Sequence, residues 1–190
     1  MNQAYWYASR STGLVSLLLL TLAMILGLLG AGRFTSTRWP RFVVASLHRN
    51  VSLLIVVFLV IHIVTAVIDP YAGIGWLDAV IPFMSVYHPL PLGLGAVAFD
   101  LILALIATSL LRTRISLGAW RAVHLTAYAC WPFAVLHGYF IGGADSRRLW
   151  VLAIEGICVM AVAGALVWRL GASHPDTVAR SADRPPARRR

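Results

Sequence analysis

Apolar residues form five runs along the chain, at 12–32, 42–68, 91–111, 117–140 and 148–170. A helix needs about 20 mostly apolar residues to cross the hydrocarbon core of a bilayer. The linkers between the runs are short, except for residues 69–90. The pattern therefore predicts an all-α membrane protein, a transmembrane helical bundle of about five spans.

The segments between and beyond the runs complete the domain plan. Residues 73–88, interrupted by Pro82, are too short and too broken for a span, so we expect a short re-entrant or interfacial segment, with a sixth span as the alternative. Residues 1–11 form an N-terminal segment, residues 12–170 the transmembrane domain, and residues 171–190 a basic, disordered cytoplasmic tail. The first run is too long for a cleavable signal peptide, and none is expected.

Composition supports the membrane assignment, because 59% of the residues are hydrophobic and only 12% are charged. All 16 basic residues are arginine, and the net charge is +9. The arginines lie mainly between the runs and in the tail, where control of topology explains them better than nucleic-acid binding does. Cys130 and Cys158 lie in different runs and are expected to be small buried residues.

Arginine placement predicts the orientation, since arginine-rich linkers stay on the cytoplasmic side. The linkers expected inside, and the tail, hold Arg33, Arg38, Arg41, Arg112, Arg114, Arg180, Arg184, Arg188, Arg189 and Arg190. The linker 69–90 has no arginine and two aspartates, and only Arg10, Arg147 and Arg148 oppose the assignment. We expect a multi-pass protein of the cell membrane with its N-terminus outside and its C-terminus in the cytoplasm.

Histidines interrupt two of the apolar runs. His48 and His62 lie 14 residues apart in the second run, and His124 and His137 lie 13 apart in the fourth. These two spans point the same way, so the four imidazoles form pairs at two depths, roughly 20 Å apart along the helices. A polar side chain at membrane depth is expensive without a partner and marks a functional site by default. His88 and His174 lie outside the runs and are expected to be surface histidines.

Helical phase fits one of the two spans. At about 100° per residue, 14 residues return to within about 40° of the starting direction, so His48 and His62 share a face. Thirteen residues leave His124 and His137 about 140° apart on an ideal helix. We expect Pro132, which lies between them, to distort the helix and bring His137 into line.

The pattern of paired imidazoles favours a metal macrocycle clamped from both faces at each depth. Neutral imidazole is a good ligand for iron, and a haem held by two histidines moves single electrons. We therefore predict two haem b groups, with His48, His62, His124 and His137 as metal ligands. The alternative is that each histidine bonds to a neighbouring helix in a membrane scaffold without haem.

Charged and aromatic residues near the histidines carry weaker predictions. Arg49 and Arg121 are candidates for binding haem propionates, and snorkelling towards lipid headgroups is the alternative for both. Arg147 and Arg148 could serve the outer haem in the same way. The acids inside spans, Asp100 and Glu155, line a proton or quinone path or bond to another helix. Trp131 and Phe133 lie between the two depths, where they are candidates for shortening the gap for electron tunnelling, although core packing is the more common role of such residues.

The spacing H-x13-H followed by H-x12-H, with the local sequences LHRNVSLL and WRAVHLTAYACWPFAVLHG, resembles the ferric reductase-like transmembrane domain family. That family includes ferric reductases, the membrane halves of NADPH oxidases and the haem subunit of a bacterial methionine sulfoxide reductase system. The resemblance covers about residues 12–170. It implies that His48 pairs with His124 on the cytoplasmic-side haem and His62 with His137 on the outer one.

The sequence departs from larger members of this family, which commonly have six spans. Residues 171–190 are too few for an FAD- or NADPH-binding domain, and no glycine-rich dinucleotide fingerprint occurs. We expect an oxidoreductase component whose donor is a separate flavoprotein, a bound flavin or a quinol, with an extracytoplasmic redox partner as acceptor. The alternative within redox function is a quinol-linked haem subunit of a multi-protein complex.

Overall fold

The computed structural model describes residues 4–32, 34, 36 and 39–171, and these form helices and turns without strands. The helices are α1 (Ala4–Ala31), α2 (Arg41–Ile68), α3 (Pro89–Leu110), α4 (Leu117–Leu125), α5 (Ala127–Ile141), α6 (Gly143–Ser146) and α7 (Leu149–Gly171). Within the described residues, α1, α2, α3 and α7 are long and apolar enough to cross a membrane. The protein is an all-α membrane helical bundle, as predicted.

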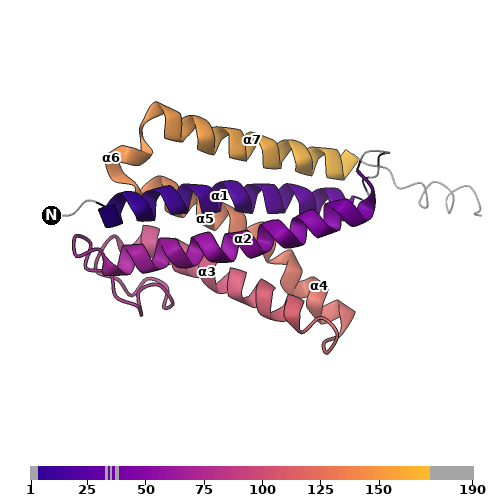
Figure 1. Ribbon diagram of the computed structural model, residues 1–190, viewed down its shortest axis with the longest axis horizontal. Coiled ribbons are helices and arrows are strands. Elements are labelled where there is room, and N and C mark those ends of the chain that lie inside the picture. Colours follow the sequence, from indigo (N-terminus) through magenta and orange to yellow (C-terminus); the bar gives the residue numbers. More distant parts are fainter. Residues whose placement is uncertain (1–3, 33, 35, 37–38, 172–190) are drawn as a thin grey trace, which may run out of the picture.

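The fourth expected span is two helices in succession, because α4 and α5 meet at Thr126 and together cover 117–141. Successive long segments run in alternating directions along the bundle (Figure 1). The first helix begins at Ala4, so residues 4–11, which we had set apart as an N-terminal segment, are the first turns of α1. The predicted tail lies outside the described residues.

Local chemistry explains several of the helix boundaries. Pro40 precedes α2, and α3 begins at Pro89, where a missing N–H costs nothing because the first turn has no intrahelical partner for it. The Ser116 hydroxyl caps α4 by accepting a hydrogen bond from the Ala119 N–H at 3.1 Å. The linker 69–88 folds into turns and contains no further spanning helix, consistent with the predicted interfacial segment.

Two helix pairs make up most of the bundle. Helix α1 packs against α2 around the buried residues Ala23, Leu26, Val44, Val51 and Ile55. Helix α3 packs against α5 around Ala98, Ile102 and Cys130. Helix α1 also contacts α5 and α7, so it joins the two pairs into one bundle.

One buried hydrogen bond crosses the centre of the bundle. The Trp131 indole N–H on α5 donates to the Thr21 hydroxyl on α1 at 3.0 Å. Trp131 therefore has a structural role in the core, the more common role expected for it. Cys130 and Cys158 are both free and buried, as expected.

Candidate metal centre

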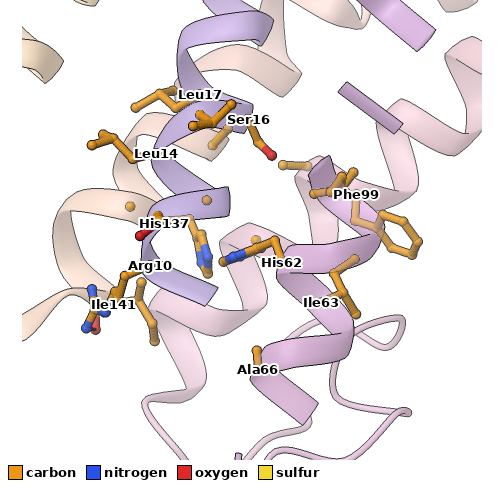
Figure 2. Close-up of a pocket in the computed structure, with 18 of the residues that line it drawn as sticks. Arg10, Leu14, Ser16, Leu17, His62, Ile63, Ala66, Phe99, His137 and Ile141 are labelled. Atoms are coloured by element: carbon orange, nitrogen blue, oxygen red, sulfur yellow. Dashed lines mark hydrogen bonds between the residues drawn. The ribbon is translucent and has the colours of Figure 1, made fainter. Parts of the chain in front are cut away.

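The four span histidines form two facing pairs, as the sequence predicted. The ring centroids of His62 and His137 are 6.2 Å apart, and those of His48 and His124 are 6.4 Å apart. In each pair one ring comes from α2 and the other from the α4–α5 segment. Figure 2 shows His62 and His137 directed towards one another across the space between their helices.

Three of the four imidazoles are oriented by backbone carbonyl groups. The Nδ1 atoms of His48, His62 and His137 lie 3.0, 2.8 and 2.8 Å from the carbonyl oxygens of Ala23, Ser9 and Pro91, in that order. A carbonyl oxygen only accepts, so Nδ1 carries the proton and donates in each bond. This fixes the tautomer in which Nε2 keeps a free lone pair, the arrangement that second-shell partners impose on metal-ligating histidines.

Glycines let the helices approach these histidine rings closely. A Cβ atom on Gly13 would lie 2.9 Å from the His62 ring, and one on Gly95 would lie 2.5 Å from the His137 ring. Gly27 faces His48 with more room, since its Cβ would lie 3.6 Å from that ring. Gly13 and Gly27 are 14 residues apart on α1, the same spacing as His62 and His48 on α2.

The fourth imidazole is held differently. The His124 ring stacks on the Trp120 indole, with centroids 4.5 Å apart and planes inclined by 21°. The Arg112 guanidinium also lies over the Trp120 ring, 4.9 Å from its centroid. The buried Nδ1 of His124 and Nε1 of Trp120 have no hydrogen-bond partner within the part of the chain that the structure describes. Stacking, rather than a carbonyl group, therefore orients His124.

The segment between the last two histidines is interrupted at Thr126, in addition to carrying Pro132. Pro132 lies inside α5, whereas α4 ends just before Thr126. The Thr126 N–H and hydroxyl both bond to the Val123 carbonyl, at 2.9 and 2.7 Å, so the turn here is tighter than an α-helix. This junction separates His124 on α4 from His137 on α5, and the ideal helical phase does not apply across it.

A cavity of about 660 Å³ adjoins the His62–His137 pair. Its walls include both rings, Gly13, Gly95 and many aliphatic side chains, together with the polar residues Arg10, Ser16, Asp78, Asp145, Arg148 and Glu155. The volume falls within the range of about 300–1,000 Å³ usual for ligand and cofactor sites. A second cavity of about 300 Å³ lies at the end of the bundle that carries the linker 69–88 (the loop end), and Arg10 lines both cavities.

The arginines predicted to bind propionates differ in their exposure and contacts. Arg49 and Arg121 are exposed, and within the described residues neither forms an ion pair or a side-chain hydrogen bond. Arg148 lines the larger cavity but pairs with Asp145 at 3.0 Å, and Arg147 is exposed. Sequence reasoning missed Arg10, because it counted this residue only as an exception to the charge rule.

The two acids inside spans differ in position. Glu155 on α7 is 7% exposed and lines the larger cavity, whereas Asp100 on α3 is half-buried and lies outside that lining. Neither carboxyl group makes a side-chain hydrogen bond to any described residue, so the helix–helix bond considered for them is not formed. His88 is exposed, as expected, and His174 lies outside the described residues.

Comparison with known protein families shows which family the chain belongs to. Residues 12–136 match the family described as "Ferric reductase like transmembrane component". The chain belongs to this family. The match covers more than half of the sequence, contains three of the four paired histidines and ends one residue before His137. No curated protein and no solved structure matches the chain significantly.

Membership of the ferric reductase-like family and the apolar helices together make the chain a multi-pass membrane protein with a redox, electron-transfer role. The predicted resemblance is thereby confirmed at the level of the family.

Proposed function

We propose that this ferric reductase-like protein binds one haem b at each histidine pair and carries electrons one at a time through the membrane. His62 and His137 would hold one haem, and His48 and His124 the other. A haem held by two histidines is low-spin and suited to one-electron transfer. The identity of the cofactor and of its ligands is the proposed part, since family membership alone indicates only a redox role in the membrane.

The observation that carries the proposal is the geometry of the two pairs. A metal–imidazole bond is about 2 Å long, so two such bonds plus the distance from each nitrogen to its ring centre put the centroids about 6 Å apart. The centroid distances of 6.2 and 6.4 Å fit this spacing. Imidazoles bonded directly to each other would lie closer. The Nδ1–H donors turned towards backbone carbonyls leave Nε2 for the iron.

The residues of the chain have separable tasks in this proposal. The carbonyls of Ala23, Ser9 and Pro91 orient three ligands, and Trp120 orients the fourth. The aliphatic walls of the cavity exclude water from the His62–His137 site. The electron donor would be a separate flavoprotein, a bound flavin or a quinol, and the acceptor a redox partner outside the cytoplasm.

A reduced-minus-oxidised optical spectrum with a pyridine haemochrome count tests the proposal. We expect two haems b per chain with the sharp α-band of low-spin iron. His62→Ala should remove one haem and leave the other, and His48→Ala should do the reverse. Purified protein without a Soret band, after expression with ample haem, would defeat the proposal and favour a scaffold without haem.

The quinol-linked alternative is favoured by Glu155, whose buried carboxyl lines the cavity without a hydrogen-bond partner in the described residues. Oxidation of a quinol releases protons, and an ionisable group at membrane depth can receive them. Reduction of the haems by menaquinol but not by a reduced flavoprotein would establish this alternative. The opposite result would exclude it.

A further inference from the structure

Arg10 is a cation in an unexpected place. It lies near the loop end of α1, whereas most arginines outside the tail lie near the opposite end of the bundle. Its neighbour Ser9 gives its carbonyl to His62, so Arg10 lies at about the depth of the His62–His137 pair. Topology control does not account for a charge at this position, because it opposes the orientation that the other arginines favour.

The surroundings of Arg10 hold it in place without a direct ion pair. Its guanidinium lies 4.4 Å from the Trp6 ring centroid and donates a hydrogen bond to the Ile141 carbonyl at 3.2 Å. Asp145 interacts with it electrostatically but lies beyond ion-pair distance and is paired with Arg148, and no other carboxylate among the described residues forms an ion pair with it. A half-buried cation at this depth is costly unless an anion accompanies it.

The cavity beside Arg10 is where such an anion would lie. Arg10 lines the cavity of about 660 Å³ together with His62 and His137. Figure 2 shows it beside Ile141, with the His137 ring farther along towards His62. The planar guanidinium is well suited to binding a carboxylate through two parallel hydrogen bonds.

We propose that Arg10 binds a propionate carboxylate of the haem held by His62 and His137, and that its charge raises the reduction potential of that haem. The inference rests on the proposed function. Reduction adds one negative charge to the haem, and a nearby cation in a low-dielectric site stabilises the reduced form more than the oxidised form. Arg10 thus positions the propionate, and its charge adjusts the reduction potential.

Spectroelectrochemical titration of Arg10→Gln tests the inference. Glutamine removes the charge but keeps N–H groups that can donate hydrogen bonds. We expect both haems to be retained and the equilibrium constant for reducing the His62–His137 haem to fall about tenfold, which is 59 mV for one electron. The affected step is identified as the one that disappears in His62→Ala.

Two further variants make the result decisive. Arg147→Gln removes a positive charge at the same end of the bundle from an exposed side chain outside the cavity lining, and we expect it to leave both potentials unchanged. Arg10→Lys keeps the charge and should restore most of the potential.

The possible failures are distinguishable. Two haems with unchanged potentials in Arg10→Gln, or an equal shift in Arg147→Gln, would overturn the inference and leave the proposed function standing. If Arg10→Gln loses the haem, recovery of that haem in Arg10→Lys supports the need for a cation. Loss in both variants would assign Arg10 to helix packing alone and overturn the inference. Absence of haem from the unmutated protein would instead defeat the proposed function.

Discussion

At the scale of single residues, the position of each histidine ring depends on the side chain or backbone that faces it. A Cβ atom added to Gly13 would lie 2.9 Å from the His62 ring, whereas one added to Gly27 would lie 3.6 Å from the His48 ring. A Cβ atom added to Gly95 on α3 would lie 2.5 Å from the His137 ring, which is closer still. The ring positions therefore depend on glycine at two of these three places.

Gly13→Ala should weaken or abolish haem binding at the His62–His137 site. The added methyl group would lie 2.9 Å from a ring whose Nδ1 is already bonded to the Ser9 carbonyl, so the ring must turn away from its ligand position. We expect the haem content to fall by about half, read from the pyridine haemochrome count. Alanine is favoured over glycine in a helix by about 1 kcal/mol, so the helix itself should not suffer.

Gly27→Ala is the matched control on the same helix. Its methyl group would meet the His48 ring at 3.6 Å, an ordinary van der Waals contact, so both haems should be retained. Equal haem content in the two variants would show that the α1 glycines do not determine ring position.

Trp120→Leu should disturb the His48–His124 site only. His124 has no hydrogen bond at Nδ1 in the described structure, and the indole that stacks on it at 4.5 Å is its main support. We expect one of the two low-spin signals in the electron paramagnetic resonance spectrum to broaden or split, because the ring can then adopt several orientations. Trp120→Phe keeps an aromatic face and should retain a single sharp signal. Unchanged spectra in the leucine variant would contradict a role for the stack.

The sequence predicted the four histidines but not the residues that support them. A histidine in an apolar run is conspicuous because its burial is costly, and matched spacing on two parallel spans indicated the pairing. Arg10, Gly13 and Gly95 act through contacts between helices, and such contacts depend on how the helices pack. Trp120 lies one turn before His124 on α4, a spacing at which side chains meet, and this signal could have found it. Arg49 and Arg121, chosen because they are near histidines in the sequence, are exposed, and their role stays a prediction.

At the scale of helices, hydropathy predicted where the spans lie but not how the fourth one is built. The boundaries of α2, α3 and α7 differ from the apolar runs by at most two residues, whereas α1 begins eight residues before its run. The interruption at Thr126 has no hydropathy signal, because the apolar pattern continues through it. Pro132 was the visible helix breaker, yet α5 continues through it.

Thr21→Val should destabilise the packing of α1 against α5. The substitution keeps the shape of the side chain but leaves the buried Trp131 N–H without its acceptor, which is now 3.0 Å away. An unsatisfied buried donor costs about 1–3 kcal/mol. We expect a lower midpoint temperature in a thermal unfolding assay in detergent. Thr21→Ser, which retains the hydroxyl, is the control, and equal midpoints for valine and serine would contradict the bond's contribution.

At the scale of the whole molecule, the alternating directions of the helices bring the linker 69–88 and the α5–α7 connection to one end. Arg41, Arg49, Arg112, Arg114 and Arg121 lie towards the other end. By the positive-inside rule the arginine-rich end faces the cytoplasm, so we expect the loop end, with Arg10 and the His62–His137 pair, to lie on the outer side. Reaction of introduced cysteines with a membrane-impermeant thiol reagent tests this orientation.

The chain is well suited to that measurement, because its own Cys130 and Cys158 are only 1% and 2% exposed and should react slowly. Val86 in the linker is 98% exposed, so Val86→Cys should be labelled in intact cells. Thr113, which is exposed between Arg112 and Arg114, should be labelled as Thr113→Cys only after the membrane is opened. The reverse pattern would invert the bundle. The His48–His124 pair would then be the outer site, and Arg10 would act on the haem nearest the cytoplasm.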